Sequence, residues 1–219
     1  MCVRGFAIRV AFVGLVLTAC IQPITQSPSE RPRSEPAAAT ATASPLNTPG
    51  EARLPTVAGP PQPLDPGTYL TPEGFAPPVS ITVPVGWYGG AGSTGFFVGQ
   101  GLDEVNQRFA DVGLYLDVVQ LDYDAAIAAF REIEGVVIQA EPETGTIGGH
   151  EATTFEASTE GGQALLDPIA PGIDLTAAAY QQIFVDVGGT TVLIRTEVFN
   201  EAAQPALDGV LASIEFPDN

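Results

Sequence analysis

The chain has 219 residues and a formal net charge of −18 at pH 7, from 26 acidic residues against eight basic ones. The sequence contains no lysine, and residues 67–219 hold 22 acidic residues against three arginines. A surface with this charge repels phosphate backbones and anionic lipid headgroups, which argues against nucleic acid as a partner. Cations, basic proteins and neutral glycans stay open as partners, and so does a purely solvating role for the acidity.

Residues 1–19 are predicted to be a secretory signal. Arg4 and Arg9 supply positive charge, and an apolar run over 10–17 is too short to cross a bilayer, which takes about 20 residues. The following Leu17-Thr18-Ala19-Cys20 resembles the lipobox of bacterial lipoproteins. This resemblance implies cleavage before Cys20 and lipidation of Cys20, with acyl chains such as palmitate. A chance cysteine after an ordinary signal peptide is the alternative.

Residues 20–66 are predicted to be a disordered tether, because Pro, Ser, Thr and Ala dominate and large apolar residues are few. The other cysteine of the chain, Cys2, lies in the signal. The mature chain is therefore expected to have no disulfide and no cysteine metal site. Lipid on Cys20 would hold the protein at the extracytoplasmic face of a membrane.

Residues 67–219 are predicted to form one α+β domain with a central antiparallel sheet. Its first half contains strands over 79–84, 94–98 and 113–121, with a glycine-rich loop over 86–95. Asp122 then resembles the N-cap of a helix that Gly135 closes.

The second half contains the clearest predicted element, a hairpin of strands 180–187 and 190–198 around Gly188-Gly189. This turn pairs Val185 with Val192 and Ile183 with Ile194. The other predicted elements are a hairpin of 144–147 with 151–157, a long loop over 158–176, a helix over 202–213 and a short strand over 214–216.

Four segments of this domain resemble the PsbP-like family, which includes photosystem subunits, the Ran-binding nuclear import factor and LpqN-type actinobacterial lipoproteins. The segments are Ser80–Trp87, Gly145–Phe155, Gln182–Ile194 and Leu207–Phe216. The resemblance implies an antiparallel sheet flanked by helices, an α/β/α sandwich. It also implies a binding or adaptor role with no common active site, so no catalytic residue and no cofactor is assigned.

Four residues are candidate contacts for a ligand or partner: Trp87, Tyr88, Tyr180 and Arg195. Trp87 and Tyr88 lie beside glycines and could stack on a sugar, although a lone Trp after a strand usually packs inward. Tyr180 and Arg195 are placed on the mixed face of the last hairpin. Arg195 could bind an anion, and an ion pair with Glu197 is the favoured interpretation.

Three motifs suggest chemistry but lack the context that it needs. Residues 90–95 spell G-x-G-x-x-G, yet strand-like residues follow where a dinucleotide fold has a helix. Ser93 with His150 would make an envelope hydrolase, and the helix after the serine is again missing. Asp122 and Asp124 could ligate calcium in a calcium-responsive acidic domain, but helix capping explains Asp122 more simply.

We therefore expect a lipid-anchored, non-enzymatic binding or adaptor domain of the bacterial cell envelope. Its expected partners are the membrane, through lipid on Cys20, and an envelope protein, a glycan or a cation. No metal site is assigned.

Overall fold

The computed structural model describes residues 52–92, 94–103 and 105–217. The predicted signal peptide, Cys20 and most of the predicted tether lie outside these residues. The described residues all belong to one of two units into which the chain divides, residues 44–219. Within the described part, no helix combines the length and the apolar character that a membrane crossing requires.

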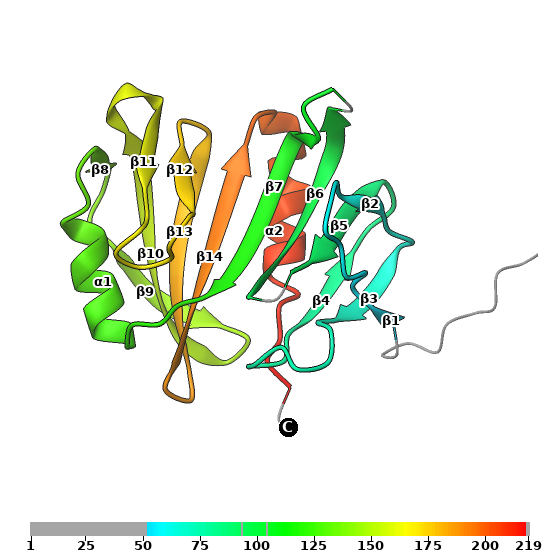
Figure 1. Ribbon diagram of the computed structural model, residues 1–219, viewed down its shortest axis with the longest axis horizontal. Helices are drawn as coiled ribbons and strands as arrows, with labels where there is room; N and C mark the ends of the chain where they lie inside the picture. Colours follow the sequence, from blue (N-terminus) through cyan, green and yellow to red (C-terminus); the bar gives the residue numbers. More distant parts are fainter. Residues whose placement is uncertain (1–51, 93, 104, 218–219) are drawn as a thin grey trace, which may run out of the picture. The chain divides into compact units, whose positions relative to one another are not determined.

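A nine-stranded sheet forms the centre of this unit, and all of its neighbouring strands pair antiparallel (Figure 1). The predicted central antiparallel sheet is thus confirmed. In spatial order the strands are β2 (Gln62–Pro63), β5 (Trp87–Ala91), β6 (Gly95–Asp103), β7 (Arg108–Val118), β14 (Thr190–Val198), β13 (Ala179–Val187), β10 (His150–Thr159) and β8 (Val136–Ile138), with β9 (Glu143–Ile147) also paired to β10.

Two smaller sheets accompany the central one. The first joins β1 (Ala52–Arg53), β3 (Gly67–Leu70) and β4 (Ser80–Val83), and β1 runs parallel to β3. The second is a hairpin of β11 (Gln163–Leu165) and β12 (Asp174–Thr176). This hairpin lies in the region predicted to be a long loop, which corrects that prediction.

The helices are short and lie on opposite faces of the sheet. They are α1 (Tyr123–Arg131) and α2 (Gln204–Leu211), with the single 3₁₀ turns η1 (Glu160–Gly162) and η2 (Glu201–Ala203). Asp122 caps α1 as predicted, because its Oδ1 accepts a hydrogen bond from the backbone N–H of Ala125 at 2.9 Å. Figure 1 shows α1 at one end of the sheet and α2 crossing β7.

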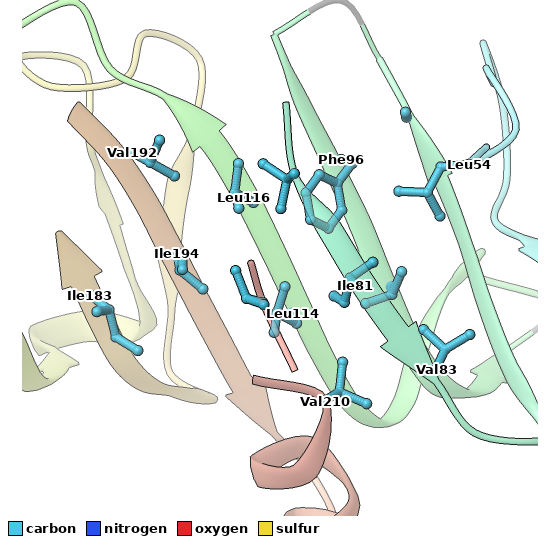
Figure 2. Packing of buried hydrophobic residues seen from close by; sticks show 14 of the residues in the cluster. Leu54, Ile81, Val83, Phe96, Leu114, Leu116, Ile183, Val192, Ile194 and Val210 are labelled. Carbon is cyan, nitrogen blue, oxygen red and sulfur yellow. The ribbon is translucent and has the colours of Figure 1, made fainter. Parts of the chain in front are cut away.

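Alternation along the strands divides the core between these two faces. Val192 and Ile194 of β14 point into a cluster with Leu114 and with Val210 of α2 (Figure 2). Leu193 points to the other face, where Phe155 and Phe184 pack against Phe130 of α1. Each face thus carries one short helix, and the described part is mostly strand. The expected α/β/α sandwich, with helical layers on both faces of the sheet, is therefore not confirmed.

The folded unit begins before residue 67, which corrects the predicted end of the tether. Leu54 and Leu64 are 2 % and 8 % exposed and belong to the core cluster on the α2 face. Thr56 also bridges Ala91 of β5. The few apolar residues of this proline-rich stretch are therefore enough to fix it on the sheet.

The predicted glycine-rich loop over 86–95 is also wrong, because residues 87–91 form β5. The glycines serve a close approach between segments. A Cβ atom at Gly90 would lie 2.3 Å from a methyl group of Val57, and one at Gly89 would lie 2.8 Å from the carbonyl oxygen of Phe97. A side chain at Gly90 would displace the segment before β2, and one at Gly89 would collide with the backbone of β6.

The predicted hairpin around Gly188-Gly189 is confirmed in its register, with Val185 opposite Val192 and Ile183 opposite Ile194. Both turn glycines have positive φ, 61° and 87°, as a type I′ turn requires. One irregularity occurs between Ala179 and Gln181. This bulge changes the face to which Tyr180 points.

Candidate functional site

A pocket of about 1280 Å³ lies on the α1 face of the sheet, over β6, β7 and β14. Phe97, Tyr115 and Arg195 are directly opposite one another on these three strands and line it together. Residues from β12 and from the turn between β6 and β7 line it as well. We call it the sheet pocket and define it by Phe97, Asn106, Tyr115, Asp174, Arg195 and Glu197.

Arg195 is held in place from three sides. Its Nη2 donates to Oδ2 of Asp117 at 3.2 Å, and its Nη1 donates to the carbonyl oxygen of Asp174 at 3.1 Å. The guanidinium carbon lies 5.0 Å from the ring centroid of Tyr115. With only 9 % of the residue exposed, these contacts fix Arg195 as part of the pocket floor.

The ion-pair partner of Arg195 is therefore Asp117, and the favoured pairing with Glu197 is wrong. Asp117 lies diagonally across from Arg195 on the neighbouring strand, within reach of a long side chain. Glu197 instead accepts a hydrogen bond from Oγ1 of Thr176 on β12, at 2.8 Å. This bond and the contact of Arg195 with Asp174 tie β12 to the sheet.

Burial changes the proton affinity of two groups in this network. Burial raises the pKa of Asp117 above its ordinary value of 3.8, and the charge and hydrogen bond of Arg195 oppose that rise. Burial also raises the pKa of Tyr115, and the charge of Glu197 and a hydrogen bond with its carboxylate raise it further. Tyr115 thus stays protonated at neutral pH and donates to Glu197.

Aromatic rings line the pocket beside this polar floor. The Phe109 ring lies over two glycines, since a Cβ atom at Gly99 would be 2.4 Å from its Cγ and one at Gly113 would be 3.0 Å from its Cδ2. Its centroid is 6.3 Å from that of Phe97 and 6.0 Å from that of Tyr115. Phe199, which is 50 % exposed, adds a ring to the lining.

Among the four predicted contact residues, Arg195 lines the sheet pocket and the other three do not. Trp87 is 1 % exposed and packs in the core on the α2 face, which does not support a contact role. Tyr88 is half-buried on β5, opposite Gly99.

Tyr180 is separated from Arg195 by the bulge in β13. Its hydroxyl accepts a hydrogen bond from Nε2 of Gln204, the first residue of α2, at 2.7 Å. Since α2 packs on the opposite face, the two residues predicted to share one face lie on different faces.

The hydrolase alternative finds no support in the described part. Ser93 lies outside the described residues, as does Cys20. Gly95 begins a strand, so the helix that a nucleophile elbow needs is not there. His150 is the first residue of β10, and its ring stands edge-on to Phe216 with centroids 5.3 Å apart.

For the calcium alternative, the acidic residues lie near one another but do not form a metal-binding group. Asp122 and Asp124 line a second pocket of about 470 Å³ together with Glu151 and Asp186. In the part of the chain that the structure describes, no three acidic, histidine or cysteine side chains form a group that could hold a metal ion.

Several residues of the sheet pocket were not singled out from the sequence. Tyr115 and Asp117 lie in a strand that was correctly expected, and a carboxylate between Leu116 and Val118 is an unusual feature that could have been noticed. Asp174 and Thr176 belong to β12, in the region that the sequence predicts to be a loop, so no strand pattern marks them. Phe199 follows β14 directly and carries no pattern of its own.

Similarity to a protein of known structure was found for the fold. No protein-family model and no curated protein matches the chain. The chain is similar to the solution structure of cyanobacterial PsbP (CyanoP) from Synechocystis sp. PCC 6803, with 11 % sequence identity and a TM-score of 0.40. The similarity covers 80 % of this chain and 100 % of that one.

Proposed function

We propose that this chain is a lipid-anchored, non-catalytic binding or adaptor protein of the bacterial cell envelope. The sheet pocket is the observation that supports binding, because it is a large concave site with aromatic walls and a few fixed polar groups. The lipobox at Leu17-Thr18-Ala19-Cys20 supports anchoring at the extracytoplasmic face. The four segments that resemble the PsbP-like family support an LpqN-type lipoprotein domain.

The polar floor of the pocket favours binding over catalysis. Arg195 is engaged by Asp117, and Glu197 is engaged by Thr176 and Tyr115. A general base or nucleophile needs a reactive atom within hydrogen-bond reach of a substrate. These groups instead bond to one another through Nη2 of Arg195, the Glu197 carboxylate and the Asp117 carboxylate, and hold the shape of the floor, which suits a preformed recognition site.

The anchor is tested by labelling cells that express the full chain with a radioactive fatty acid. The wild-type chain is expected to take up label and to partition into detergent, and Cys20→Ser is expected to do neither. Cys2→Ser is the matched control, because it removes a cysteine of the signal and leaves the lipobox intact. An unlabelled wild-type chain contradicts the anchored half of the proposal.

Binding is tested in the same cells with a photo-reactive amino acid at Phe199, a pocket residue that is half exposed. Irradiation is expected to attach one defined envelope component there. The same amino acid at Val85, which is 76 % exposed and does not line the pocket, is the control. Equal products from both positions would contradict a pocket-directed partner.

A further inference from the structure

The sheet pocket is less acidic than the domain around it. Two of the three arginines between residues 67 and 219, Arg108 and Arg195, line it. The lining carboxylates Asp103, Asp174 and Glu197 nearly balance them. The pocket is therefore close to neutral within a chain of net charge −18. The ligand charge that the pocket favours thus differs from the one that the whole surface favours.

Arg108 supplies an available donor at this place. The ion pairs between described residues are those of Arg53 with Glu73 and of Arg195 with Asp117. Arg131 lies over the ring of Phe155. Arg108 has none of these contacts within the described ranges, and it is exposed. Its guanidinium can donate two parallel hydrogen bonds to a ligand.

Aromatic rings and amide groups accompany this donor. Phe97 and Tyr115 are half-buried and Phe199 is half exposed, so part of each residue remains accessible to a ligand. A pyranose ring presents an apolar face of C–H groups, which packs on the negative face of an aromatic ring. Gln107 adds a side-chain amide at the same wall, suited to pairs of hydroxyl groups, while Asn106 already donates through Nδ2 to Asp103 and offers its Oδ1 as an acceptor.

Size and charge narrow the class of ligand. A volume of about 1280 Å³ exceeds the roughly 300–1,000 Å³ of pockets for drug-sized molecules, which leaves room for more than one sugar ring. A polyanion would be repelled by the surrounding carboxylates, and a cation at this wall would meet the exposed guanidinium of Arg108. A neutral, polyhydroxylated ligand with apolar ring faces avoids both costs.

From these observations we infer that the sheet pocket binds a neutral oligosaccharide, with Phe199 as a stacking platform and Arg108 as a hydroxyl-binding donor. The inference rests on the proposed binding function and names its ligand class.

Calorimetric titration of the full lipidated chain, held in a zwitterionic detergent, tests this site. The probes are cellotetraose, chitotetraose and maltotetraose, with tetragalacturonate as the anionic counterpart. At least one neutral probe is expected to bind, and Phe199→Ala and Arg108→Gln are each expected to weaken that binding about tenfold or more. Val85→Ala and Arg131→Gln are the matched controls outside the pocket and should leave the affinity unchanged.

Two results would overturn the inference. One is the absence of binding to every neutral probe, and the other is binding that is tighter for tetragalacturonate or insensitive to both pocket variants. Photo-attachment of a protein at Phe199 in cells, together with silent titrations, would leave the proposed adaptor function standing and remove only the sugar. If no probe gave heat in the titrations and nothing was attached at Phe199, both the oligosaccharide site and the proposed binding function would be contradicted.

Discussion

Arg195 and Asp117 show how one pair of side chains shapes the candidate site. Both lie largely out of solvent, with side chains 11 % and 18 % exposed. An ion pair in such a place adds little net stability, but removing one partner leaves a buried charge without compensation and costs about 3–5 kcal/mol. Arg195 also reaches the carbonyl of Asp174, so its loss would loosen the wall of the pocket as well as its floor.

Asp117→Asn removes the titratable carboxyl, so the difference in stability between the wild type and this variant reports the titration of Asp117. Since burial raises the pKa of Asp117 in the folded state above 3.8, the folded protein binds this proton more readily than the unfolded chain does. Its contribution to stability is therefore present below pH 3.8 and is lost as the pH rises through the folded pKa. We expect the free energy of unfolding of the wild type, relative to Asp117→Asn, to fall across this window.

Denaturant unfolding at a series of pH values measures this difference. Asp208→Asn, at an exposed position on α2, controls for the general effect of removing a negative charge. A difference between wild type and Asp117→Asn that stays flat or rises with pH would show that burial does not control this group.

Gly99 permits the close packing of Phe109, and a second substitution tests that role. Gly99→Ala would place its Cβ 2.4 Å from the Phe109 ring and 2.5 Å from the carbonyl oxygen of Val112. We expect a loss of about 1–3 kcal/mol, as for other overpacked sites. Gly145→Ala on β9 is the control, because nothing lies within 4 Å of its added Cβ. Equal stability of the two variants in denaturant melts would contradict this packing.

At the scale of elements, the parts that could be predicted are those with a local cause. Gly188-Gly189 specifies its hairpin because both residues must take positive φ, and the register then follows from the two-residue turn. Asp122 marks the start of α1 because its carboxylate accepts a backbone N–H of the first turn. Neither signal depends on distant parts of the chain.

The parts that could not be predicted depend on contacts between distant segments. Gly89 and Gly90 indicate a loop by composition, yet they form a strand because β6 pairs with them and Val57 packs against Gly90. Simple alternation along β13 predicts Tyr180 on the same face as Arg195, but a bulge between Ala179 and Gln181 places it on the other face. In the site, Arg195 was singled out by its rare charge, whereas Asp117 became its partner only when β7 and β14 paired.

The segment before β3 offers a test at this scale. Leu54 and Leu64 fill the core from a stretch whose composition predicts disorder, so Leu54→Ala and Leu64→Ala should each destabilise the domain by about 2–5 kcal/mol. Val85→Ala, at a position that is 76 % exposed, should cost far less. The melting temperatures of the three variants and the wild type, measured by thermal unfolding, test this order. If both leucine variants melted like the wild type, residues 52–66 would contribute nothing to the stability of the fold and would belong to the tether.

At the scale of the whole molecule, charge opposes the fold. A net charge of −18 with no lysine makes repulsion between carboxylates the dominant long-range term. Salt shortens the Debye length from about 30 Å at 0.01 M to about 8 Å at 0.15 M. We expect the melting temperature to rise between these two salt concentrations, as scanning calorimetry would record. A melting temperature that is constant or falls would show that the acidic surface is already neutralised locally.

The two edges of the central sheet have a consequence for copies of this domain at high concentration. One edge is β2, which has only two residues, and Pro63 there has no N–H to offer another strand. The other edge is formed by β8, three residues long, and by β9, which begins at the charged Glu143. At the described edges of the central sheet, copies of the domain packed densely side by side therefore find no long, uncharged strand on which to polymerise. High local density and resistance to fibre formation are compatible in this fold.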